Sequence, residues 1–119
     1  MDVKIIADKE NRKLFALLSG DIDHHTSKHI REEVDSAVKL HDPKTLVLDF
    51  SAVTFMDSSG IGLVMGRYKL MKELSGELII ANTPMYIKKV MMLAGMDLLC
   101  KIAEIPQPDK TDTKESENK

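Results

Sequence analysis

Residues 45–50, Thr-Leu-Val-Leu-Asp-Phe, form an almost wholly apolar run that follows a proline. A strand with one solvated face alternates apolar and polar residues, whereas a continuous apolar run indicates a strand that is covered on both faces. Such a strand lies inside a sheet, and a helix in the connection to it supplies the crossover. The run therefore predicts an α/β fold with residues 45–50 as its central strand.

The flanking patterns predict the other elements. A polar turn separates two short apolar runs, which indicates an opening hairpin. Three segments with helical periodicity follow, each ending before a strand-like run, with Thr26 as the expected N-cap of the first helix. The predicted order is β-β-α-β-α-β-α-β. The predicted strands are 3–7, 13–18, 45–50, 77–81 and a short one within 98–105; the predicted helices start at Thr26, Ser58 and Thr83-Pro84, and the second and third end at Leu74 and Leu93.

Length and composition limit the class of protein. The chain has 119 residues, 43% of them hydrophobic, and a net charge of -2, which suits one compact domain and favours a protein partner over nucleic acid or a membrane surface. The single Cys100 and the polar start of the chain favour a cytoplasmic location, with Cys100 as a small core residue. We expect the domain to span 1–105 and the polar segment 106–119 to be a disordered tail.

The junction at 55–62, Phe-Met-Asp-Ser-Ser-Gly-Ile-Gly, is the predicted functional site. A strand-like run ends there and a helix begins, so Ser58 falls on the first helical turn, where free N–H groups and the helix dipole favour a capping hydroxyl or a phosphoryl group. We interpret Gly60 as a point of close approach by a partner and Gly66 as a helix–sheet packing position. The apolar residues of this helix cover roughly 220° at 100° per residue, so either neighbouring helices cover the excess or a partner does.

Several enzymatic sites are excluded by spacing. A nucleophile elbow requires a glycine two positions before the serine and a later histidine, but all four histidines precede Ser58. The nucleotide-binding glycine motifs are also absent, and His24, His25 and His29 lack a convincing set of further zinc ligands. We therefore expect a protein that is not an enzyme, with no catalytic residues, no metal and no cofactor.

Three motifs in order resemble a known family. They are Gly-Asp-Ile-Asp-His-His-Thr at 20–26, Thr-Phe-Met-Asp-Ser-Ser-Gly at 54–60 and Gly-Arg-Tyr-Lys at 66–69. The chain resembles the bacterial anti-sigma factor antagonists of the STAS fold, most of all the sporulation branch that acts on the anti-sigma F factor. The resemblance implies a mixed sheet of four or five strands flanked by helices. The polar tail is a departure, because such proteins often have a final helix there.

The resemblance also implies a mechanism. The unphosphorylated protein would bind an anti-sigma factor that is itself a serine kinase, so that the sigma factor is released. The kinase would phosphorylate Ser58, and a PP2C-type serine phosphatase would remove the phosphate. Asp57 is interpreted as a helix N-terminal acid and recognition residue, not as a catalytic base. The alternative is a STAS-type nucleotide- or anion-binding regulatory module. The residues assigned to partner binding are Asp23, His24, His25, Thr26, Asp57, Ser59, Gly60 and Ile61.

Overall fold

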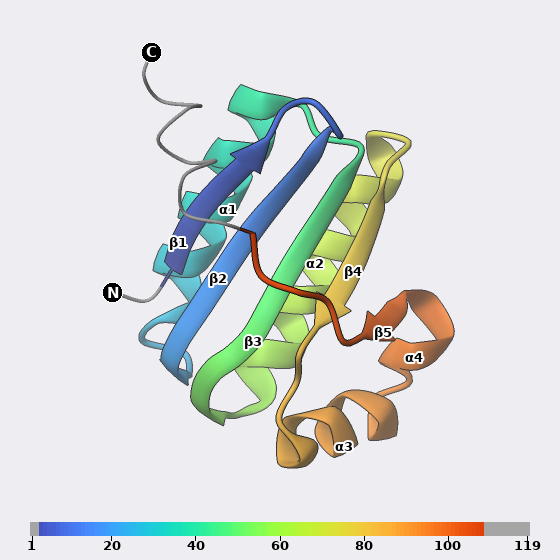
Figure 1. Ribbon diagram of the computed structural model, residues 1–119. Coiled ribbons are helices and arrows are strands. Elements are labelled where there is room, and N and C mark those ends of the chain that lie inside the picture. Colours follow the sequence, from blue (N-terminus) through green and yellow to red (C-terminus); the bar gives the residue numbers. More distant parts are fainter. Residues whose placement is uncertain (1–2, 109–119) are drawn as a thin grey trace.

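The computed structural model describes residues 3–108, which form one layer of helices packed on a five-stranded sheet (Figure 1). The strands are β1 (Val3–Asp8), β2 (Lys13–Ile22), β3 (Thr45–Met56), β4 (Glu77–Ala81) and β5 (Lys101–Ala103). The helices are α1 (Ser27–His41), α2 (Ser58–Glu73), α3 (Met85–Leu93) and the single turn α4 (Met96–Leu99). The predicted α/β class and order are confirmed, with α4 as an addition.

The sheet is mixed, and its strands lie in the order of the sequence. β1 pairs with β2 in antiparallel orientation, whereas β2, β3, β4 and β5 are parallel to one another. The carboxyl ends of the parallel strands therefore lie at one end of the sheet, where the β2–α1, β3–α2 and β4–α3 connections gather (Figure 1). α1 and α2 cover one face of the sheet, and α3 and α4 lie near the edge formed by β4 and β5 (Figure 1).

The central strand is covered on both faces, as its composition predicts. Leu46, Leu48 and Phe50 belong to the main core, which also contains residues of α1 and α2, whereas Val47 packs with Ile6 and other residues in a second, smaller cluster. The chain after β5 crosses in front of the sheet and brings Ile105 against this second cluster (Figure 1). The sheet therefore has an apolar core on each side of β3.

A polar network holds the crossing segment to the sheet. Asn82, whose φ of 56° is left-handed, hydrogen-bonds through its side chain to both the N–H and the C=O of Ile105, at 2.8 and 2.7 Å. The buried Asp49 accepts hydrogen bonds from Asn82 and Gln107, at 2.8 and 3.3 Å. Gln107 lies in the segment predicted as a disordered tail, and its side chain contacts the domain through Asp49 and Ser51. Residues 109–119 of that segment lie outside the described part of the chain.

Three strands, β1, β2 and β3, are longer than predicted. β2 continues beyond its predicted end at residue 18 as far as Ile22, because the backbone of Asp21 and Ile22 pairs with Phe55 and Met56 of β3. Residues 96–99, part of which we expected in the last strand, form α4, and β5 retains only three residues that pair with β4. The length of an apolar run in the sequence therefore underestimates the length of a strand that pairing with a neighbouring strand extends.

The apolar faces of α1 and α2 are buried against the sheet and the core. α1 buries Ile30, Val34, Ala37 and Val38, which share one face at helical spacing. In α2 the apolar excess is largely covered, because residues such as Ile61 and Tyr68 pack in part against the core. None of the helices in residues 3–108 has the length and apolar character needed to span a membrane.

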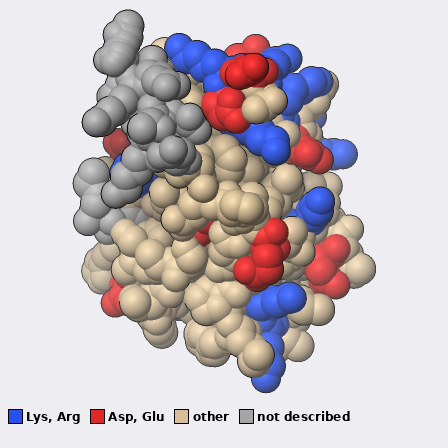
Figure 2. Space-filling view, viewed as in Figure 1, with Lys and Arg blue, Asp and Glu red and all other residues tan. Residues whose placement is uncertain are grey.

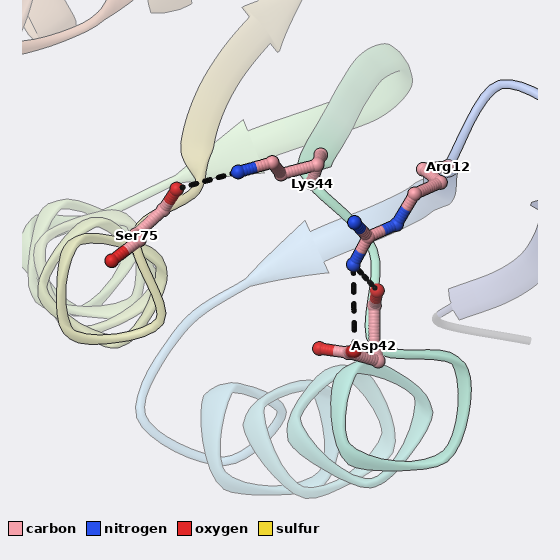
Figure 3. A network of polar contacts seen from close by, with 4 residues as sticks. All are labelled: Arg12, Asp42, Lys44 and Ser75. Atoms are coloured by element: carbon pink, nitrogen blue, oxygen red, sulfur yellow. Dashed lines mark hydrogen bonds and ion pairs between the residues drawn. The ribbon is translucent and has the colours of Figure 1, made fainter.

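The end of the sheet opposite the β3–α2 connection carries exposed charges of both signs. Arg12 donates to the backbone oxygen of Asp42 at 2.8 Å and forms an exposed ion pair with its carboxylate at 3.4 Å (Figure 3). Lys44 donates to the backbone oxygen of Ser75 at 3.4 Å (Figure 3). Figure 2 shows lysine, arginine and acidic side chains gathered at this upper end. Exposed pairs of this kind contribute little free energy to stability.

Candidate functional site at the β3–α2 junction

Asp57 is the residue that ends β3 and starts α2. It has extended backbone angles, and its Oδ1 accepts a hydrogen bond from the backbone N–H of Ser59 at 2.8 Å, while its C=O accepts from Gly60 N–H at 2.9 Å. An acid at this position satisfies free N–H groups of the first turn and interacts favourably with the helix dipole. The predicted helix acid is therefore the N-cap itself.

Ser58 is the first residue of α2, and it is exposed. Because Asp57 caps the helix, the Ser58 hydroxyl is not needed for capping. Within residues 3–108 the Ser58 hydroxyl makes no hydrogen bond. An approaching enzyme would therefore reach this hydroxyl without breaking a contact of the fold.

The β2–α1 loop is built around Asp23. Its Oδ1 accepts hydrogen bonds from the backbone N–H groups of His25 and Thr26, at 2.9 and 3.1 Å. Partial burial opposes ionisation of Asp23, but these two hydrogen bonds and the nearby charges of His25 and His24 outweigh it and lower the pKa of the carboxyl. Thr26 occupies the predicted N-cap position, but its hydroxyl donates to the backbone oxygen of Asp21 at 2.9 Å and does not cap α1.

Hydrogen bonds hold the two connections side by side. The N–H of Asp57 donates to the backbone oxygen of Ile22 at 3.1 Å, and the hydroxyl of Thr54 donates to the carboxylate of Asp21 at 2.9 Å. The structure thus brings Asp21 and the loop that contains Asp23 to the same end of the sheet as Ser58. The exposed rings of His24 and His25 lie 4.0 Å apart between centroids in this loop.

The glycines of α2 differ from our interpretation. Gly60 is buried, and a Cβ there would lie 2.2 Å from Cγ and 2.4 Å from Sδ of the buried Met56. A Cβ at Gly66, which we expected to pack, would have no atom within 4 Å, and the same holds for a Cβ at the exposed Gly62. The two interpretations were therefore wrong: Gly60 allows packing on Met56, and Gly66 leaves open space. The side chains that remain accessible at the start of α2 are those of Asp57, Ser58, Ser59 and Ile61.

Sequence reasoning missed a buried ion pair between α1 and α2. Arg67 is only 6% exposed, and its Nε lies 2.9 Å from Oδ1 of Asp35 without the geometry of a hydrogen bond. Its terminal nitrogens Nη1 and Nη2 donate to Leu63 O at 3.2 Å and to Asp35 Oδ2 at 3.4 Å, respectively. Burial lowers the pKa of Arg67, the charge of Asp35 opposes this, and the charge of Arg31 adds to it. The available signal was the angular position of Arg67, which falls in the middle of the buried stripe of α2.

A groove of about 430 Å³ runs beside this ion pair, between α1 and α2. Ser27 and Arg31 line it from α1, and Ser59, Gly62, Gly66 and Arg67 line it from α2. Because Ser59 borders the groove, the groove adjoins the start of α2.

The described residues do not support a metal site. Across residues 3–108 there is no group of three or more histidine, cysteine or acidic side chains that could hold an ion, so His24, His25 and His29 belong to no such group. Cys100 is partly buried against the core, and this burial raises the pKa of its thiol. What the junction offers is therefore an exposed hydroxyl among fixed acids and backbone groups, which suits recognition and modification.

Comparison with known proteins agrees with this architecture. The model of the STAS domain matches residues 4–106. An anti-sigma F factor antagonist from Paenibacillus polymyxa is 32% identical over 96 residues, which are 81% of this chain and 82% of that protein. The solved structure of the anti-sigma factor antagonist SpoIIAA in its unphosphorylated form superposes with a TM-score of 0.72 at 24% identity, covering 96% of this chain and 95% of the other.

A further solved structure has the same fold. The Bacillus cell fate determinant SpoIIAA in its phosphorylated form superposes with a TM-score of 0.66 at 24% identity, covering 96% of this chain and 98% of the other. At this identity the two superpositions establish the fold, and the match to the domain model together with the 32% identical relative establishes the family. The chain belongs to the STAS-domain family of anti-sigma factor antagonists.

Proposed function

We propose that this chain is a phosphorylation-controlled anti-sigma factor antagonist: in its unphosphorylated form it binds an anti-sigma factor and releases a sigma factor, of the sporulation sigma F type. The observation that carries the proposal is the exposed, unengaged hydroxyl of Ser58 at the first residue of α2, within the described part of the chain. The surface around it consists of the start of α2 and the β2–α1 loop. These are the segments that hold the residues assigned to partner binding.

The geometry supports Ser58 as the modified residue. A kinase must bring the hydroxyl to the γ-phosphate of its ATP, so an exposed hydroxyl at the edge of the domain is a suitable substrate and a buried one is not. Ser59 is less exposed, and its N–H is held by Asp57. The fold therefore tolerates a phosphate on Ser58 without loss of its α2 cap.

The same geometry explains how a phosphate would switch binding off. A phosphate adds about -1.5 to -2 charges, and here it would stand next to the carboxylate of Asp57. Two unit charges 4 Å apart repel by about 1 kcal/mol in water and by about 4 kcal/mol at the effective dielectric constant of a protein surface. A partner that packs closely on the unphosphorylated surface would have to desolvate the phosphate, and any acidic group of the partner at this contact would be repelled by it. The switch needs no change of fold.

The proposed cycle has two enzymes, and this chain is neither of them. An anti-sigma factor serine kinase adds the phosphate, and a PP2C-type serine phosphatase removes it. The chain acts by binding in the cytoplasm and needs no cofactor, metal, nucleic acid or membrane. His24, His25 and Thr26 border the surface in the β2–α1 loop, where they would contact the partner together with Asp23, Asp57, Ser59 and Ile61.

Mass measurement after incubation with the kinase and ATP tests the modified residue. We expect one added phosphate in the wild type and in the matched control Ser59→Ala, and none in Ser58→Ala. A phosphate that persists in Ser58→Ala would assign the modification to another residue.

Binding to the ADP-bound anti-sigma factor tests the switch. We expect Ser58→Ala to bind as tightly as the unphosphorylated wild type and not to be released by ATP, and Ser58→Asp to bind much more weakly. Equal affinities of the two variants would contradict the proposal. Tight binding of ATP or GTP by this chain alone would instead favour the nucleotide-binding alternative.

A further inference from the structure

The groove between α1 and α2 has the features of an anion site. Among residues 3–108 Arg31 has no ion-pair partner, and it is exposed at the groove, close enough to Arg67 for its charge to act on that residue. The hydroxyls of Ser27 and Ser59 line the same groove, and neither makes a hydrogen bond within the described part of the chain. Two guanidinium groups and two hydroxyls therefore border one space.

Arg67 lines the same groove but is already paired. Its side chain is 8% exposed, and its Nε lies 2.9 Å from Oδ1 of Asp35, whose side chain is 28% exposed. Its terminal nitrogens donate to Leu63 O and to Asp35 Oδ2. Among the described residues, Arg31 is therefore the cation at the groove that has no ion-pair partner.

The backbone of α2 is open at the same place. A Cβ at Gly62 or at Gly66 would meet no atom within 4 Å, so the groove floor is unfilled at two positions one helical turn apart. A side chain from another protein can therefore reach the level of the helix backbone beside Arg31.

We propose that the α1–α2 groove binds a carboxylate side chain of the anti-sigma factor, with Arg31 as its principal partner. Carboxylates form two parallel hydrogen bonds with a guanidinium group, and the groove carries positive charge next to a surface that is otherwise acidic through Asp23 and Asp57. This proposal for the groove rests on the proposed function. Ser58 does not line the groove, so its phosphorylation leaves the groove itself unchanged, and the contact serves to orient the partner over the switch residue.

The test is the affinity of the chain for its ADP-bound anti-sigma factor, measured by calorimetry for wild type, Arg31→Glu and the matched control Lys39→Glu. Lys39 is an exposed cation on the same helix that does not line the groove. We expect Arg31→Glu to weaken binding at least tenfold and Lys39→Glu to change it less than threefold. An acidic residue of the anti-sigma factor changed to arginine should restore the binding of Arg31→Glu.

Other outcomes separate this inference from the function on which it rests. If Ser58→Ala and Ser58→Asp still differ in affinity but Arg31→Glu binds like wild type, the groove proposal is overturned and the switch stands. If the two Ser58 variants bind equally, the switch itself fails. Titration with inorganic phosphate, followed by the amide signals of Gly62 and Gly66, tests a free small anion as the occupant: binding below millimolar concentration would overturn a carboxylate of the partner.

Discussion

A matched pair of substitutions in α2, Gly60→Ala and Gly66→Ala, should change stability in opposite directions. In Gly60→Ala the new Cβ would lie 2.2 Å from Cγ of Met56, which is 2% exposed, so that side chain must move inside the core. Overpacking of this kind costs about 1–3 kcal/mol, and the gain in helix propensity returns about 1 kcal/mol. The expected net loss reaches about 2 kcal/mol.

Gly66→Ala lacks the steric term. No atom lies within 4 Å of the added Cβ, so only the helix propensity acts, and we expect a gain of up to about 1 kcal/mol. Urea unfolding followed by circular dichroism measures both variants against the wild type. With an m value of about 1.5 kcal/mol/M, a difference between the variants of up to about 3 kcal/mol separates their midpoints by up to about 2 M. A Gly60→Ala midpoint equal to or above that of Gly66→Ala would refute the packing role of Gly60.

Three further predictions concern other parts of the chain. Because the pKa of Asp23 is lowered in the fold, its contribution to stability is present above the ordinary pKa of 3.8 and is lost as the pH falls through the lowered pKa. The amide signals of His25 and Thr26 should therefore titrate with a midpoint below pH 3.8. A midpoint above pH 3.8 would contradict the hydrogen bonds to Asp23. Asp35→Asn should cost about 2–3 kcal/mol in urea unfolding, because it leaves the buried guanidinium of Arg67 without its countercharge. Arg67→Met should cost less, because the charge it leaves unpaired is that of Asp35, whose side chain is 28% exposed and can be solvated. The reverse order would argue against the ion pair. Asn82→Gly keeps the left-handed backbone but removes the side-chain hydrogen bonds to Ile105, so it should lower the free energy of unfolding by about 2 kcal/mol and speed proteolysis near residue 105. Unchanged proteolysis would show that these hydrogen bonds do not hold the segment.

The β3–α2 junction shows which features of the site can be predicted from the sequence. The position of Ser58 on the first turn of a helix follows from the local pattern, because helix starts depend on residues within one turn. The same local reasoning failed for Gly60 and Gly66. A glycine is identical in sequence whether it accommodates a core side chain or leaves open space, and only the position of Met56 distinguishes the two cases.

Long-range pairing accounts for the other differences. Asp21 and Ile22 look like loop residues, but they continue β2 because β3 offers a partner strand beyond the apolar run 45–50. Arg67 looks like a surface cation of a helical motif, but Asp35, 32 residues earlier, provides the countercharge that allows its burial. In both cases the deciding contact joins residues that are distant in the sequence.

By itself the sequence determined the class of fold, the order of its elements and the residue that begins α2, because hydrophobic periodicity and capping act over a few neighbouring residues. The tertiary structure alone decided that the Asp23 loop lies beside Ser58, that Arg67 is buried and that a groove opens along Gly62 and Gly66. Those features depend on the registry of β2 with β3 and on the packing of α1 against α2, and neither is encoded in any single segment.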